Sequence, residues 1–138
     1  EYIAKVILDG TISRVTSVTV GLYNDTTDAL TDANDLSDIT TEPSDGNYAR
    51  QTINLNNTDV TIQQTNGDWE GVFAQTEFDT TSTTGTVDSY FVVINVQLAG
   101  DGAAADHLLF TGDLDASYDL SSVDTFRIDA DTAGLSLT

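Results

Sequence analysis

Short runs in which apolar and polar residues alternate make up most of this chain, and turn-forming Asp, Asn and Gly separate them. Residues 15–23 place Val18, Val20 and Leu22 on one face, which is the period expected of a strand with one buried side. Residues 87–98 are apolar along one face from Tyr90 onward and on both faces in the middle. That pattern predicts a central strand that is covered on both sides.

The same alternation predicts a hairpin and several shorter strands. Residues 48–55 and 58–63 flank an Asn-Asn-Thr turn signal, so we expect these two segments to pair with each other. Their inward faces would hold Ala49, Ile53 and Leu55 in the first segment and Val60 and Ile62 in the second. Further strands are expected at residues 2–8, 68–78, 107–111, 123–129 and 134–138.

Residues 24–46 interrupt this pattern with a long polar segment that is rich in Asp. Within it an apolar residue recurs at every third position, which predicts one or two helical turns lying over the strands. These apolar positions are Leu30, Ala33, Leu36 and Ile39. The 138 residues therefore predict an all-β chain with residues 1–138 as one domain. The expected fold is an antiparallel two-sheet β-sandwich, Ig-like or jelly-roll in type, with a long acidic loop that carries a short helical insert.

The charge of the chain excludes two classes of partner. The net charge is −19, because 19 Asp and 4 Glu stand against only Lys5, Arg14, Arg50 and Arg127. No basic patch can be assembled from four such residues, so a nucleic acid and an anionic membrane surface are both excluded as partners. The chain has no cysteine, which excludes a disulfide framework and a thiol nucleophile.

Such an acidic domain makes physical sense in concentrated salt. In dilute buffer the carboxylates repel one another, whereas at about 1 M salt the Debye length contracts to about 3 Å. We therefore expect a protein adapted to high salt. An acidic domain with specific divalent sites and a partly disordered chain are the competing interpretations.

No arrangement of residues in the sequence supports catalysis. His107 is the only histidine and has no Ser or Cys partner in a recognisable motif, so a structural role is expected for it. Trp69 stands in the turn-rich context NGDWEG, where the indole is expected either to be buried or to anchor a partner or a sugar ring. The sequence predicts neither an enzyme nor an organic cofactor.

Clustered carboxylates are candidates for binding Ca²⁺ or Mg²⁺, which prefer oxygen ligands on flexible loops. The main cluster comprises Asp25, Asp28, Asp32 and Asp35. Asp113 with Asp115, and Asp129 with Asp131, form two smaller pairs. None of them fits an EF-hand loop, because the glycine which that loop requires is absent, and a solvated acidic surface is the alternative.

Two Asn-x-Thr sequons add candidate modification sites. They begin at Asn24 and at Asn56, and both are expected to lie in turns. An oligosaccharide could be accommodated at either if the protein met a glycosylating machinery, although chance matches are expected in a chain rich in Asn and Thr.

From Val18 onward the chain carries a series of short motifs. They are Leu22-Tyr23-Asn24, then Gly46-Asn47-Tyr48-Ala49-Arg50 after the acidic segment, Trp69, Glu77-Phe78 and Ser89-Tyr90-Phe91-Val92-Val93. Their order resembles that of small accessory virion proteins of tailed viruses. In that family a strand ending in Leu-Tyr-Asn leads through an acidic segment to a Gly-Tyr-Ala-Arg strand, followed by a Trp, a Thr-Phe pair and a Gly-Tyr-Phe-Val strand. The resemblance covers roughly residues 18–98 and departs from the family where Asn47 separates Gly46 from Tyr48.

The resemblance implies a β-rich structural protein on the head or tail of a tailed virus, with no catalytic residue to carry over. Combined with the acidity, it leads us to expect a virion component of a haloarchaeal tailed virus, a capsid decoration, turret or cementing subunit. Other virion proteins such as the major capsid protein, and further copies of the chain, are the expected partners. A tail-associated protein and a cell-surface or adhesin-like domain of a halophilic archaeon are the alternatives.

Overall fold

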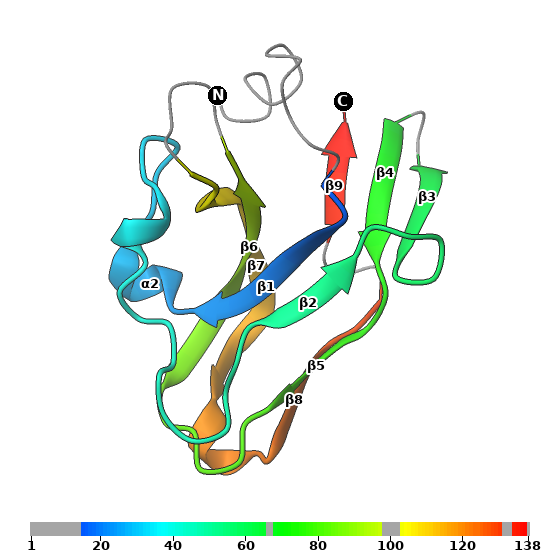
Figure 1. The fold of residues 1–138 in the computed structure, drawn as a ribbon. Coiled ribbons are helices and arrows are strands. Elements are labelled where there is room, and N and C mark those ends of the chain that lie inside the picture. The colour runs from blue at the N-terminus through cyan, green and yellow to red at the C-terminus, as the bar shows by residue number, and fades with distance from the viewer. Residues whose placement is uncertain (1–14, 66–67, 98–102, 131–133, 138) are drawn as a thin grey trace.

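The computed structural model describes residues 15–65, 68–97, 103–130 and 134–137 (Figure 1). This part of the chain contains nine β-strands and three short helical turns. The elements are β1 (Ser17–Tyr23), α2 (Asp25–Asp28), η1 (Leu36–Asp38), β2 (Gln51–Asn54), β3 (Val60–Thr65), β4 (Asp68–Phe73), β5 (Thr76–Asp79), β6 (Thr86–Val96), β7 (Ala105–Asp119), η2 (Leu120–Ser122), β8 (Thr125–Ile128) and β9 (Gly134–Leu137). All strand pairs are antiparallel, so the chain is all-β, as predicted.

The first layer is a four-stranded sheet in the order β2-β1-β6-β7. β6 lies inside this sheet and pairs with β1 on one side and β7 on the other. Every residue of β6 from Ser89 to Ile94 is buried, which confirms the central strand that the two-sided apolar pattern predicts.

The second layer is a bent ribbon of strands that faces the first. β4 and β5 follow each other with only residues 74–75 between them, and they pair with β9 and β8 respectively. β3 extends the β4–β9 end of the ribbon as a third strand. Figure 1 shows the ribbon running down one side of the molecule, from β4 and β9 to β5 and β8.

Apolar side chains from both layers form one core. The four-stranded sheet contributes Val18, Val20, Leu22, Ile53, Val87, Tyr90 and Val92, and the ribbon contributes Phe73, Phe78, Phe126 and Ile128. Leu120 of η2 is fully buried in the same cluster. The second layer consists of two smaller sheets, β3-β4-β9 and β5-β8, so the described strands form three sheets. Their packing is consistent with a sandwich-like fold, whereas the two-sheet form and the Ig-like or jelly-roll type stay predictions.

The acidic segment 24–46 covers the outer face of the four-stranded sheet. Tyr23, Phe91 and Val93 point away from the main core and form a second cluster on that face. Leu30, Leu36 and Ile39 of the acidic segment pack against this cluster. The predicted cover over the strands therefore exists, but its two helical turns lie at α2 and η1, and Ala33 is exposed.

The predicted hairpin between residues 48–55 and 58–63 is wrong. β2 pairs with β1, where Ile53 lies opposite Val18, and β3 pairs with β4 in the other layer. Ile62 is 66% exposed instead of inward-facing, because the outer strand β3 leaves the core along its length, so that Val60 still packs on the core and Ile62 lies beyond it. The Asn-Asn-Thr segment does contain a turn, but this turn connects β2 in one layer to β3 in the other.

Other strand predictions need smaller corrections. The segment 68–78 is broken into β4 and β5, and Trp69 lies within β4 opposite Gln64 and Leu137 instead of in a turn. The strand expected at 107–111 is β7, which is fifteen residues long. In segment 48–55 the alternation fails outside the short β2, because Ala49 and Leu55 are exposed while Tyr48 packs on the core. The strand expected at residues 2–8 lies outside the described residues.

Candidate functional site

Carboxylates that accept several hydrogen bonds each close the acidic segment into a loop and connect it to the sheet. Asp28, at the end of α2, accepts from the backbone N–H and the hydroxyl of both Thr40 and Thr41, with the hydroxyl oxygens 2.6 and 2.7 Å away. Partial burial raises the pKa of Asp28, but these hydrogen bonds outweigh it and hold the pKa below its usual range. The carboxylate thus closes the segment into a loop by joining residue 28 to residues 40–41.

Asp88 makes the corresponding connection from the sheet. Its carboxylate, on β6, accepts from the backbone N–H groups of Asp25 and Thr26 and from the Thr26 hydroxyl, at 2.6, 3.2 and 2.6 Å. Burial raises the pKa of Asp88, and the hydrogen bonds, the one from Thr26 foremost, lower it by more. Asp88 was not predicted as a site residue, and its only local signal in the sequence is a carboxylate near the start of a largely apolar strand.

The four Asp residues predicted as a cation site do not act together, because those that form hydrogen bonds have different partners in the fold. The Asp25 carboxylate accepts from the Tyr23 hydroxyl and from the Leu30 N–H, both at 3.1 Å. Asp35 caps η1, where it accepts from the N–H of Ser37, while Asp38 reaches back to the N–H of Asp35. Asp32 is exposed.

No group of three or more His, Asp or Glu side chains within the described ranges is placed so that it could hold a metal ion. Asp25 lies beside Asp88 and Asp113 in one shallow hollow, a grouping that the sequence did not predict. The carboxylate of Asp115 accepts from the Tyr118 hydroxyl and that of Asp129 from the Gln75 side-chain amide. Asp131, the predicted partner of Asp129, lies outside the described residues.

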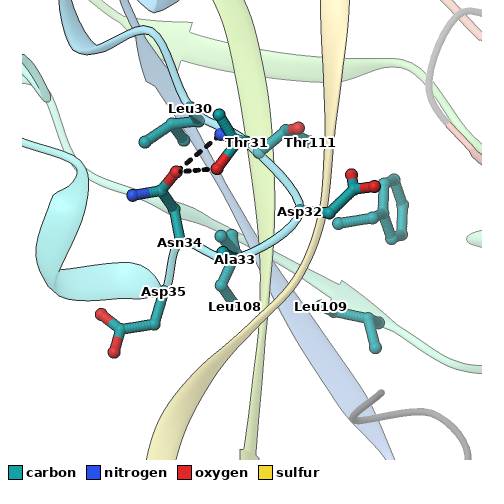
Figure 2. A pocket seen from close by; sticks show the side chains of 10 residues that line it. Leu30, Thr31, Asp32, Ala33, Asn34, Asp35, Leu108, Leu109 and Thr111 are labelled. Carbon is teal, nitrogen blue, oxygen red and sulfur yellow. Dashed lines mark hydrogen bonds between the residues drawn. The ribbon is translucent and has the colours of Figure 1, made fainter.

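A larger hollow lies between the acidic segment and β7, with a volume of about 830 Å³. Residues 30–35 form one wall, and residues 108–111 of β7 form the other (Figure 2). The Asn34 side-chain oxygen accepts from the N–H and the hydroxyl of Thr31, at 2.6 and 2.7 Å, and so holds the turn of the first wall. The hollow combines the apolar residues Leu108, Leu109 and Phe110 of β7 with Asp32 and Asp35 of the acidic segment.

An ion pair at the border of the acidic segment is a further feature that was not predicted from the sequence. The Arg50 guanidinium donates to both carboxylate oxygens of Glu42, at 2.8 and 2.7 Å. The Tyr48 hydroxyl donates to the same carboxylate and accepts from the Leu22 N–H at 2.8 Å. Hydrogen bonding to Glu42 raises the pKa of Arg50, and burial raises the pKa of Tyr48. The bidentate pair of Arg50 with Glu42 and the hydrogen bond between Tyr48 and Leu22 together hold the end of the acidic segment on the sheet.

The remaining candidates from the sequence, the histidine and the two sequon asparagines, lie in a strand, a helix cap and a connection. His107 lies half-buried on β7, opposite Ile94. Asn24 caps α2 and is half-buried, whereas Asn56 is exposed in the connection between β2 and β3. None of the helical turns in the described ranges has the length and apolar character of a membrane-spanning helix.

Comparison of the chain with protein-family models, with curated proteins and with solved structures found no match.

Proposed function

We propose that this chain is a non-enzymatic structural subunit of a virus particle, a decoration, turret or cementing subunit on the capsid of a tailed virus that lives in high salt. Two sequence features support this: the resemblance over residues 18–98, and the net charge of −19. In the structure, both faces of the four-stranded sheet are covered, one by the ribbon and the other by the acidic segment. Such a rigid, acidic block suits a part that is present in many copies on a surface.

The observation that carries the proposal is the edge strand β7. This fifteen-residue strand is the last of its sheet, and among the described strands none pairs with its outer edge. Leu108, Leu109 and Phe110 follow one another on it and are only half-buried. Their neighbours across the pair, Val92 and Val93, are at most 2% exposed. A long edge with apolar side chains is a ready surface for pairing with another chain.

We assign this edge to contact between copies of the chain. A strand of a second copy would satisfy the outer backbone groups of β7, and its apolar side chains would enter the hollow beside Leu108 and Phe110. In concentrated salt, screened ion pairs contribute little, so backbone hydrogen bonds and apolar contacts are the interactions that remain effective. The major capsid protein would be bound by other surfaces of the subunit.

Sedimentation in concentrated salt, combined with amide hydrogen exchange, tests this assignment. We expect a concentration-dependent oligomer in which the β7 amides exchange more slowly than in the dilute subunit. Because the chain has no cysteine, a single Ala116→Cys variant on β7 reports contact between copies through a disulfide, and Ser44→Cys in the acidic segment is the matched exposed control. A monomer at every concentration that also fails to co-sediment with particles would refute the proposal.

A cell-surface or adhesin-like domain of a halophilic archaeon is the second candidate, and the exposed sequon at Asn56 is compatible with it. A tail-associated virion protein is a variant of the first candidate. Recovery of the native chain in envelope fractions, and not in purified particles, would favour the surface domain. Labelling the subunit in images of the particle would separate head from tail.

A further inference from the structure

The two sequons differ in whether their reacting atoms are available. N-glycosylation needs the side-chain nitrogen Nδ2 of Asn as the nucleophile and recognises the hydroxyl of the Thr two positions later. Asn24 is followed by Thr26, and Asn56 is followed by Thr58. The sequence does not separate the two sites, but their hydrogen bonds do.

At Asn24 both groups take part in the fold. Nδ2 donates to the Thr86 carbonyl at 3.1 Å, while the side-chain oxygen accepts from the Thr27 N–H at 2.9 Å and caps α2. The Thr26 hydroxyl donates to Asp88 at 2.6 Å. A sugar on Asn24 would displace the bond to Thr86 and push the start of the acidic segment away from β6.

At Asn56 the fold leaves both groups accessible. Asn56, Asn57 and Thr58 are all exposed in the connection between β2 and β3. The Asn56 side-chain oxygen accepts from the N–H groups of Thr58 and Asp59, at 2.8 and 3.0 Å, so the amide is held in one orientation. Within the described part of the chain, neither Nδ2 of Asn56 nor the Thr58 hydroxyl makes a hydrogen bond.

We propose that Asn56 is an N-glycan acceptor and that Asn24 is not. The donor is a lipid-linked oligosaccharide: a bond forms between Nδ2 and carbon C1 of the first sugar, and the bond from C1 to the lipid phosphate breaks. Nδ2 loses one proton, and the lipid phosphate leaves with the electron pair. Particle proteins and envelope proteins alike can carry glycans, so occupancy at Asn56 does not by itself decide between the two candidate functions.

The test is to secrete the full chain from a halophilic archaeal host with active N-glycosylation, together with a glycoprotein of that host as a reporter. Intact-mass and glycopeptide spectrometry should find one glycan, on the peptide that contains Asn56. Asn56→Gln and Thr58→Val should each abolish it, whereas Thr58→Ser, which keeps the hydroxyl, should retain it. Asn24→Gln should leave the glycan in place.

Two outcomes would overturn the proposal. One is a glycan attached at Asn24 in the folded, secreted chain. The other is a bare chain recovered beside a fully glycosylated reporter, because the donor and the enzyme were then present. Circular dichroism of each variant shows whether a lost glycan reflects the sequon or a misfolded chain.

Discussion

The ring of Phe91 lies directly over Gly21, its partner across the β1–β6 pair. A Cβ atom built on Gly21 would be 2.3 Å from Cζ of Phe91, far inside contact distance. Gly112 on β7 has the same relation to the ring of Tyr90, with a Cβ 2.4 Å from Cζ. Two aromatic rings of the central strand therefore fill the space that glycines leave on the strands at either side.

We predict that Gly21→Ala lowers the free energy of unfolding by about 1–3 kcal/mol, because a fully buried ring has to move out of its place. Thermal or denaturant unfolding in concentrated salt measures the loss. The double variant Gly21→Ala, Phe91→Leu should be less destabilised than the sum of the two single variants, since the smaller side chain removes the clash. Additive losses of stability in the double variant would show that the residues at positions 21 and 91 do not interact in this way.

A second prediction concerns the connection between Asp28 and residues 40–41. Asp28→Ala removes the acceptor of four hydrogen bonds and should lower the free energy of unfolding by about 1–2 kcal/mol, a value reduced by the solvent exposure of the site. Asp32→Ala, in the same segment but exposed, is the control and should have little effect. Equal losses in the two variants would contradict the role given to Asp28.

The salt dependence of folding follows from the net charge of −19. We expect the melting temperature to rise steeply with NaCl or KCl concentration and to level off near about 1 M, where the Debye length is about 3 Å. Circular dichroism melts over a salt series measure this. A melting temperature independent of salt would mean that the carboxylates do not destabilise the fold by mutual repulsion.

Acid should destabilise the folded chain once repulsion is screened. The pKa values of Asp28, Asp45 and Asp88 are below the usual range in the folded state. The unfolded chain therefore binds more protons, and the stability from these groups, complete above about pH 4, is lost as the pH falls through the lower folded values. In concentrated salt, unfolding curves between about pH 7 and pH 2 should show a plateau followed by a decline. Rising stability over the acid range would contradict this.

The raised pKa of Tyr23 leads us to expect a loss of folding stability at alkaline pH. Burial raises its pKa to about 12, and its hydroxyl donates to Asp25. The neutral hydroxyl is thus favoured by the fold, so its contribution is complete below about pH 10, where an unfolded tyrosine ionises, and is lost as the pH rises toward 12. Ultraviolet titration should show one class of tyrosines ionising late, and Tyr23→Phe should remove one residue from that class. Ionisation of all five tyrosines near pH 10 in the folded chain would refute this.

Local patterns were sufficient to predict the all-β class, the strand β1 with Val18, Val20 and Leu22 inward, and the doubly covered strand β6. These features depend on the period of apolar residues within one segment, and burial follows that period wherever a strand packs on a layer. The presence of a cover over the sheet was predictable for the same reason, from the spacing of Leu30, Leu36 and Ile39.

Only the tertiary structure decided which strands pair and which carboxylates are used. A turn signal after Asn54 could not tell that β2 pairs with β1 and that β3 crosses to the other layer, because pairing depends on contacts between distant parts of the chain. In the same way Asp88 contacts residues 25–26, some sixty positions earlier, and Thr86 occupies the amide of Asn24. Composition determined that the surface is acidic, but the long-range hydrogen bonds of the fold determined which of its polar groups remain available to a partner.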